Sequence, residues 1–239
     1  MSIRILGPIA AAVTLLVAPA TGQAAFSSTD FDGDTVPNAS DNCIVVPNPG
    51  QAPGATPTDG AACSGARSRA SVKALRFAYS KPQIEVIYRA LPAGPMPGWG
   101  VETWGRVRLP LPGAENKQAN MLLNEPVVPN LWQGQVFFTH ERGGHMYNRT
   151  LHDAVRTFQA DIAYGRSLVA TGDAIIATYP AEHNPYPVSN IVLECRTVQT
   201  KVYYCYAWWF PVAPFVGPKI QLFYVLQDGN PDPATHDDG

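Results

Sequence analysis

The sequence predicts a mainly β protein, in which most of the chain forms an antiparallel β-sandwich or barrel-like domain with at most one helix. Charged residues make up only 15% of the chain, which also contains 23 prolines and 20 glycines. This composition favours short strands and many turns over long solvated helices. A series of short apolar segments, each bounded by turn residues, follows residue 70 and supports the same fold class.

The first 25 residues have the pattern of a secretory signal peptide. Arg4 precedes an apolar run that ends near residue 20, and the small residues Ala24 and Ala25 follow it. The run is interrupted by Pro8 and Pro19 and is shorter than the roughly 20 apolar residues that a bilayer span needs. We therefore expect cleavage after Ala24 or Ala25, and a secreted, periplasmic or cell-surface protein with no membrane anchor of its own.

The stretch DFDGDTVPNASD, residues 30–41, has the oxygen-ligand spacing of a calcium loop. Ca²⁺ prefers about six to eight oxygen ligands, and alternate side chains of a tightly curled loop converge on one point. The predicted ligands are Asp30, Asp32, Asp34, the carbonyl of Val36, Asn38 and Asp41. Because the four carboxylates repel one another, we expect the loop to order only with calcium bound. The alternative is a polar linker in which Asp and Asn only form turns.

The same stretch resembles a thrombospondin type 3 repeat. The match consists of Asp-x-Asp-Gly-Asp, Val-Pro, Asp-Asn-Cys and Asn-Pro-x-Gln, all within residues 30–51. The resemblance implies calcium coordination by the aspartates and a disulfide between Cys43 and Cys63. Thr35 stands where the family has Gly at a sharp turn, so we expect a β-branched residue at positive φ. Of the acids in the second half only Asp59 remains, so one calcium site is expected where an intact unit holds two.

Four cysteines in an exported chain indicate two disulfides. Proximity in the sequence favours pairing Cys43 with Cys63 and Cys195 with Cys205. Neither pair has the spacing of a zinc site. If residues 199–201 form the loop of a hairpin, Cys195 lies directly opposite Cys205, where cross-strand Cβ atoms are close enough for a bridge.

The expected domains are a calcium-binding segment at 26–63, a linker at 64–70, a β-rich domain at 71–228 and a disordered acidic tail at 229–239. The predicted strands are 72–79, 84–91, 101–109, 133–139, 174–179, 190–198, 202–210 and 219–227. Residues 151–164 carry two patterns. Leu151, Val155, Phe158 and Ile162 recur at helical spacing, while alternation from 158 to 164 fits a strand. We favour a helix there.

The predicted hairpin at 190–210 sorts its side chains onto two faces. One face is apolar and contains the disulfide. The other mixes charged groups with aromatic rings and is formed by Glu194, Arg196, Tyr204, Tyr206 and Trp208. On an exported β domain, such a face is a candidate ligand or partner surface, where rings stack on sugars or contact another protein. The alternative is that a second layer covers the rings.

No motif in the chain has the pattern of a catalytic site. His140 and His145 are five residues apart, which does not match the helical zinc signature, and the glycine pair between them favours a loop or hairpin turn. The basic residues are scattered, so a nucleic-acid partner is not expected. We expect a secreted calcium-binding protein that acts as a non-enzymatic, adhesion-like module with a carbohydrate or protein partner. The alternative is an exported hydrolase that uses His140, His145 or His183.

Overall fold

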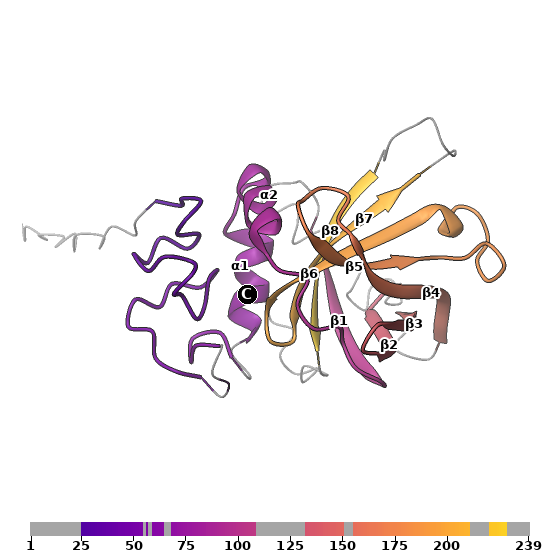
Figure 1. The fold of residues 1–239 in the computed structure, drawn as a ribbon, viewed down its shortest axis with the longest axis horizontal. Coiled ribbons are helices and arrows are strands. Elements are labelled where there is room, and N and C mark those ends of the chain that lie inside the picture. Colours follow the sequence, from indigo (N-terminus) through magenta and orange to yellow (C-terminus); the bar gives the residue numbers. More distant parts are fainter. Residues whose placement is uncertain are drawn as a thin grey trace, which may run out of the picture.

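The computed structural model describes residues 25–54, 56, 59–64, 68–108, 132–150, 155–210 and 220–228. Residues 1–24 of the predicted signal peptide and the whole acidic tail lie outside this set. Where the structure describes it, the N-terminal segment consists of turns and isolated bridges, and two helices and then eight strands follow in the described part of the chain. In Figure 1 the helices lie between the N-terminal segment and the strands. None of the described helices is long and apolar enough to cross a membrane.

The eight strands form one antiparallel meander that closes on itself. Their bounds are Val101–Arg108 (β1), Gly134–His140 (β2), Gly143–Thr150 (β3), Val155–Arg166 (β4), Asp173–Thr178 (β5), Ile191–Gln199 (β6), Val202–Trp209 (β7) and Ile220–Asp228 (β8). Each strand pairs with the next, and β8 pairs with β1, so the sheet is a closed barrel. A 3-10 turn, Val188–Asn190, precedes β6. The mainly β prediction is therefore confirmed, and the strand pairing supports its barrel-like form.

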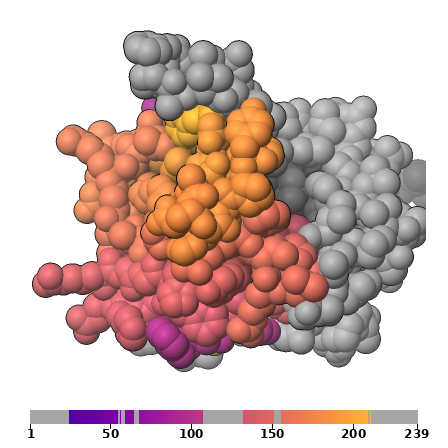
Figure 2. All heavy atoms as spheres, turned by 90° about the vertical axis from the view of Figure 1, so that its right-hand side faces the viewer, coloured from indigo at the N-terminus to yellow at the C-terminus, as the bar shows by residue number. Residues whose placement is uncertain are grey.

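The interior of the barrel is a packed apolar core. Its buried residues include Phe137, Met146, Ile162, Ile175, Leu193 and Tyr203, together with the disulfide Cys195–Cys205. Between them remains a cavity of about 10 Å³, which is roughly the space of one water molecule. The barrel is thus filled by its own side chains. Figure 2 shows the side turned away from the N-terminal segment, where the coloured surface belongs to described residues of the barrel.

Both predicted disulfides are confirmed. Cys195 pairs with Cys205 across β6 and β7 in the register expected for a short hairpin. Lys201, in the hairpin turn, has φ 68°. Cys43 pairs with Cys63 and closes the second half of the N-terminal segment.

Residues 68–90 form two helices, α1 (Ser68–Phe77) and α2 (Lys81–Ala90), so the strands predicted at 72–79 and 84–91 are wrong. The limit of one helix is wrong for the same reason. A capping box of Ser80 and Gln83 begins α2, and the buried residues Ile84, Ile87 and Tyr88 follow helical spacing. The β-branched residues in this region favoured strands in the prediction, but the capping box and the helical spacing of the buried residues are those of a helix. Residues 68–70 of the expected linker belong to α1.

The helix favoured at 151–164 is also wrong over its described part, because Val155 begins β4. The competing strand pattern is correct for Ala160 and Ile162, which face the barrel interior, whereas Phe158 and Tyr164 are exposed. Phe158 is the extra residue of a β-bulge, with φ 54°. Strand β3 was not predicted: the glycine pair expected in a loop or hairpin turn begins this strand, after a turn at 141–142.

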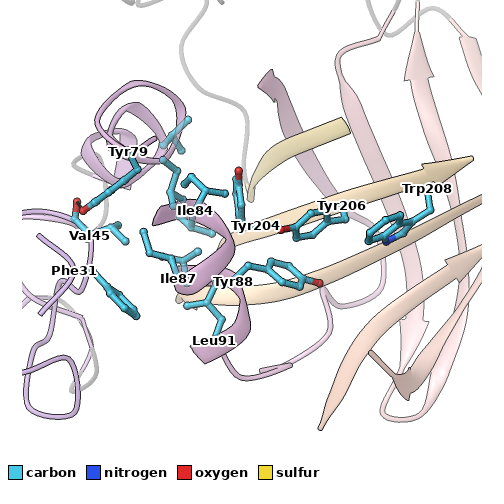
Figure 3. Packing of buried hydrophobic residues seen from close by; sticks show 14 residues of the cluster. Phe31, Val45, Tyr79, Ile84, Ile87, Tyr88, Leu91, Tyr204, Tyr206 and Trp208 are labelled. Atoms are coloured by element: carbon cyan, nitrogen blue, oxygen red, sulfur yellow. Dashed lines mark hydrogen bonds between the residues drawn. The ribbon is translucent and has the colours of Figure 1, made fainter. Parts of the chain in front are cut away.

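The helices cover the outer face of β6 and β7. The ring of Tyr88 lies 4.3 Å from that of Tyr206 and 6.2 Å from that of Tyr204. Figure 3 shows the side chains of this layer in a row that continues from Phe31 and Val45 in the N-terminal segment, across α2, to Trp208 on β7. One apolar cluster therefore joins the three parts of the structure.

Candidate metal centre

Side-chain hydrogen bonds to the backbone curl the acidic loop. Asp30 accepts from the amides of Gly33 at 2.8 Å and of Thr35 at 3.0 Å, and Asp34 accepts from the amide of Val36 at 2.8 Å. Gly33 has φ 71° and Thr35 has φ 78°. The prediction of positive φ at Thr35 is confirmed, at a cost of roughly 1–2 kcal/mol for a residue with a Cβ.

The curl brings three carboxylates together. One oxygen from each of Asp30, Asp32 and Asp34 lies within 4.8 Å of the other two. Two ligands of one Ca²⁺ can be at most about 5.2 Å apart, since each Ca–O distance is 2.3–2.6 Å. The spacing therefore fits a shared calcium ion. Oδ2 of Asp32 is buried and accepts no hydrogen bond from any described residue, so it is an acceptor without a donor.

Burial and mutual repulsion raise the pKa values of two acids in the loop. Burial, followed by the charges of Asp41 and Asp34, raises the pKa of Asp32 to about 7. Burial also raises the pKa of Asp41, against hydrogen bonds that lower it. A bound cation would remove this penalty, because an opposite charge favours the ionised form.

The other predicted ligands are placed differently. Asp41 accepts from the amide of Cys43 at 2.8 Å and from Nε2 of Gln51 at 3.0 Å, and it acts on Asp32 through its charge. Asn38 uses its side chain to accept from the amide of Phe31 and to donate to a backbone carbonyl. Val36 donates its own amide to Asp34. The group within 4.8 Å thus contains three of the six predicted ligands.

The second half of the segment supports the loop and docks it. The amide of Asn48 donates to Oδ2 of Asp34 at 2.7 Å, which ties the acidic loop to the Asn-Pro-x-Gln turn. Asp59 is buried and accepts from the amide of Thr200 at 3.2 Å. Gln199 donates to the carbonyl of Cys63. Asp59 therefore helps to hold the segment on the turn between β6 and β7.

The predicted ligand face on β6 and β7 is not a surface. Its five residues lie side by side as the hairpin register requires, but all are buried. Their exposed fractions are 0% for Glu194, 2% for Arg196, 0% for Tyr204, 2% for Tyr206 and 8% for Trp208. The physical reason is the helix layer, since α2 packs its own apolar side chains against these rings. The alternative of a covering layer is the correct one.

Glu194 and Arg196 have structural partners under that layer. Glu194 accepts from the hydroxyls of Tyr88 at 2.8 Å and Ser167 at 2.6 Å, and from the amide of Leu168 at 2.7 Å. Arg196 donates to the carbonyls of Leu91 and Thr171, both at 2.7 Å. These contacts give both buried charges hydrogen-bond partners, although Nε of Arg196 has none among the described residues, and they join β6 to α2 and to the loop before β5.

A different aromatic cluster is exposed on the outside of the barrel. We call it the Trp99 cluster; its members are Trp99, Phe138, His140, His145 and Tyr147. The indole of Trp99 is 62% exposed and lies 5.2 Å from both Phe138 and His140. The sequence did not show this cluster, because Trp99 precedes β1 and its neighbours lie on β2 and β3. Only strand pairing brings them together.

The three histidines that the structure describes belong to no group that could share a metal ion. His140 and His145 lie around the exposed Trp99, and His183 is in an exposed turn before β6. Among the described residues, the group Asp30, Asp32 and Asp34 is the only set of three or more His, Cys, Asp or Glu side chains close enough to share a metal ion. Asp161 is the cross-strand neighbour of His145, and among the described residues no third His or carboxylate joins them as a metal-binding group.

Comparisons with known proteins give little guidance. Neither a family model nor a curated protein matches the chain. A solved structure described as a protein from Thermomonospora curvata aligns with 69% of this chain and 98% of its own, at 12% identity and a TM-score of 0.41. This similarity is too slight to assign a fold or a function.

The raised pKa of Asp32 predicts an unusual pH dependence for the calcium-free protein. A folded-state pKa of about 7, against an ordinary value of 3.8, means that the folded state holds this proton more tightly than the unfolded state. Its contribution to stability is complete below about pH 4 and is lost as the pH rises through about 7. The measurement compares the unfolding midpoints of the wild type and Asp32→Asn without calcium. Relative to the variant, the wild type should be more stable at pH 5 than at pH 7.5. An identical difference at both values would contradict it.

Proposed function

We propose that this protein is exported and binds one calcium ion in its N-terminal segment, next to a barrel that acts as a non-enzymatic interaction module. The observation that carries the proposal is the convergence of three aspartate oxygens within 4.8 Å, with one buried carboxylate oxygen left without a donor. Carboxylate oxygens are hard ligands, which suit Ca²⁺ or Mg²⁺ rather than the softer metals.

The loop suits calcium better than magnesium. Magnesium demands near-ideal octahedral geometry and keeps several water ligands, whereas calcium accepts several carboxylates in an irregular shell. Asp30, Asp32 and Asp34 would form the base of the site, and Asp41 would close it. Val36 would add its carbonyl and Asn38 its side-chain oxygen. The ion would neutralise the repulsion among the acids. The resemblance to a thrombospondin type 3 repeat supports the same ion.

Titration of residues 26–239 with calcium in a calorimeter tests the site. We expect binding with a dissociation constant of about 10⁻⁴–10⁻³ M, the range of extracellular modules. Asp32→Asn keeps the size of the side chain but removes one charge, so binding should weaken at least about tenfold. Asp30→Ala and Asp41→Ala should each abolish it. Asp161→Asn, on the exposed face of β4, is the matched control and should bind as the wild type does. Wild-type protein that gives no heat at millimolar calcium would refute the proposal.

The proposed partner surface is the Trp99 cluster, in which the rings of Trp99 and His140 are exposed and the other three are partly buried. Arg156, which is half exposed, places its guanidinium 5.5 Å from the ring of Phe138. Exposed Trp, Tyr and Arg side chains are the groups that most often dominate binding at protein interfaces, and flat rings also stack on sugars. A carbohydrate or protein partner is therefore proposed here rather than on β6 and β7. Export is supported by the two disulfides, which persist in oxidising compartments.

A further inference from the structure

The N-terminal segment and α1 meet at a seam where Phe31 and Val45 are buried and an open cleft remains beside them. A cleft of about 500 Å³ lies between them, lined by Phe26, Phe31 and Val45 on one side and by Ala74 and Tyr79 on the other. Asp32 also lines this cleft. The cleft is open to solvent along the seam, so residues of the segment can move relative to α1 without opening the enclosed interior of the barrel.

The proposed calcium ligands are covalently and sterically linked to this seam. Phe31 lies between Asp30 and Asp32 in the chain, and its ring is buried in the cluster that includes residues of α1 and α2. Tyr79 donates its hydroxyl to the carbonyl of Val45 at 3.1 Å. Figure 3 shows Phe31 and Val45 at one end of the row of side chains that leads across α2 to β7.

The carboxylates of the loop also act electrostatically on Tyr79, which lies at the seam. The pKa of Tyr79 is raised, first by burial and then by the charges of Asp32, Asp41 and Asp30. Any change in that charge therefore acts on a residue that holds the segment to the helix layer.

The other half of the segment is bonded to the acidic loop through Asn48 and Gln51, but it also has anchors of its own. The disulfide Cys43–Cys63, the bond from Thr200 to Asp59 and the bond from Gln199 to Cys63 hold it on the turn between β6 and β7. A loosening of the acidic loop would thus be confined to residues 26–46, with the disulfide region as the pivot.

We infer that calcium occupancy controls the docking of residues 26–46 on α1, an inference that rests on the proposed calcium site. Without the ion, repulsion among the four carboxylates expands the loop, so Phe31 and Val45 withdraw and the seam opens. With the ion bound, the loop contracts, both side chains seat against the helix layer, and the row of packed side chains is continuous from the loop to the barrel.

Hydrogen exchange followed by mass spectrometry on residues 26–239 tests the device. The readouts are the segments 28–46, 68–77 and 155–166, with calcium at 100 times its dissociation constant and without calcium. If α1 opens together with the loop, both of the first two segments gain the same protection, about 100-fold, because the ion binds only the docked state. Strand β4, 155–166, lies outside the docked layer and serves as the unchanged reference.

Two variants separate docking from calcium binding. Phe31→Ala removes a ring at the seam and leaves every carboxylate in place. It should still bind calcium, but segment 68–77 should lose most of its calcium-dependent protection. Tyr79→Phe keeps the ring and loses the bond to Val45, so a partial loss is expected. Val86→Ala, on the exposed side of α2, is the control and should respond as the wild type does.

The outcomes are distinguishable. If calcium gives a heat of binding and protects residues 28–46 but not residues 68–77, the calcium site is supported and the calcium-dependent docking is contradicted. Absence of calcium heat would overturn both. Both proposals are supported if calcium binding releases or absorbs heat and protects segments 28–46 and 68–77 equally, and if Phe31→Ala loses the protection of segment 68–77.

Discussion

Replacing Tyr206 with alanine is expected to lower the free energy of unfolding by about 3–5 kcal/mol. The side chain is 2% exposed, its ring lies 4.3 Å from that of Tyr88, and it stacks on Trp208 at 5.4 Å. Truncation removes a large apolar body from between α2 and β7 and leaves a cavity that the closed sheet cannot collapse to fill. The measurement is the urea midpoint, with an unchanged denaturant slope as the sign that the folded and unfolded states are otherwise the same.

Trp99→Ala is the matched variant for Tyr206→Ala. Because the indole is 62% exposed, its loss should change the free energy of unfolding by no more than about 0.5 kcal/mol. If the Trp99 cluster is the partner surface, this variant should lose binding to an immobilised glycan or protein partner while it stays folded. Equal destabilisation by both variants would contradict the arrangement of one aromatic face inside and the other outside.

Glu194→Ala is expected to destabilise the protein by about 3–5 kcal/mol, the range for removal of one member of a buried charged network. The change leaves the hydroxyls of Tyr88 and Ser167 and the amide of Leu168 without their acceptor. Glu194→Gln should cost less, about 1–3 kcal/mol, because it keeps one acceptor oxygen. In one orientation the NH2 of Gln faces the N–H of Leu168, and in the other it faces the hydroxyls of Tyr88 and Ser167, which must then accept instead of donate.

Thermal and urea unfolding of these variants give the measurement. Glu182→Ala is the control, because this acid is exposed in the turn after β5 and should change stability by no more than about 0.5 kcal/mol. A loss below about 1 kcal/mol for Glu194→Ala would mean that water reaches the site, and that the buried network is not intact in solution.

In the region of α1 and α2, the local sequence pattern is compatible with both a strand and a helix. Residues 72–79 and 84–91 contain β-branched and aromatic side chains, which favour strands. The same residues carry a capping box at Ser80 and Gln83 and apolar side chains at helical spacing. For residues 151–164 a helix was favoured, but the described part is a strand whose residues Ala160 and Ile162 face the barrel interior. Tertiary burial selected one period in each case, because short segments gain most of their stability from the face they bury.

The sequence alone predicted the two disulfides and the side-by-side placement of Glu194, Arg196 and the three rings, because these follow from spacing and hairpin register. The positive φ of Thr35 was implied by the resemblance to a repeat that has Gly at this turn. Only the tertiary structure decided that β8 pairs with β1, that Trp99 joins the rings on β2 and β3, and that α2 covers the face of β6 and β7. The alternation of side chains along a strand separates its two faces, but it carries no information about which distant segment will cover either one. That choice depends on the apolar area that helices and strands bury against each other when the whole chain folds.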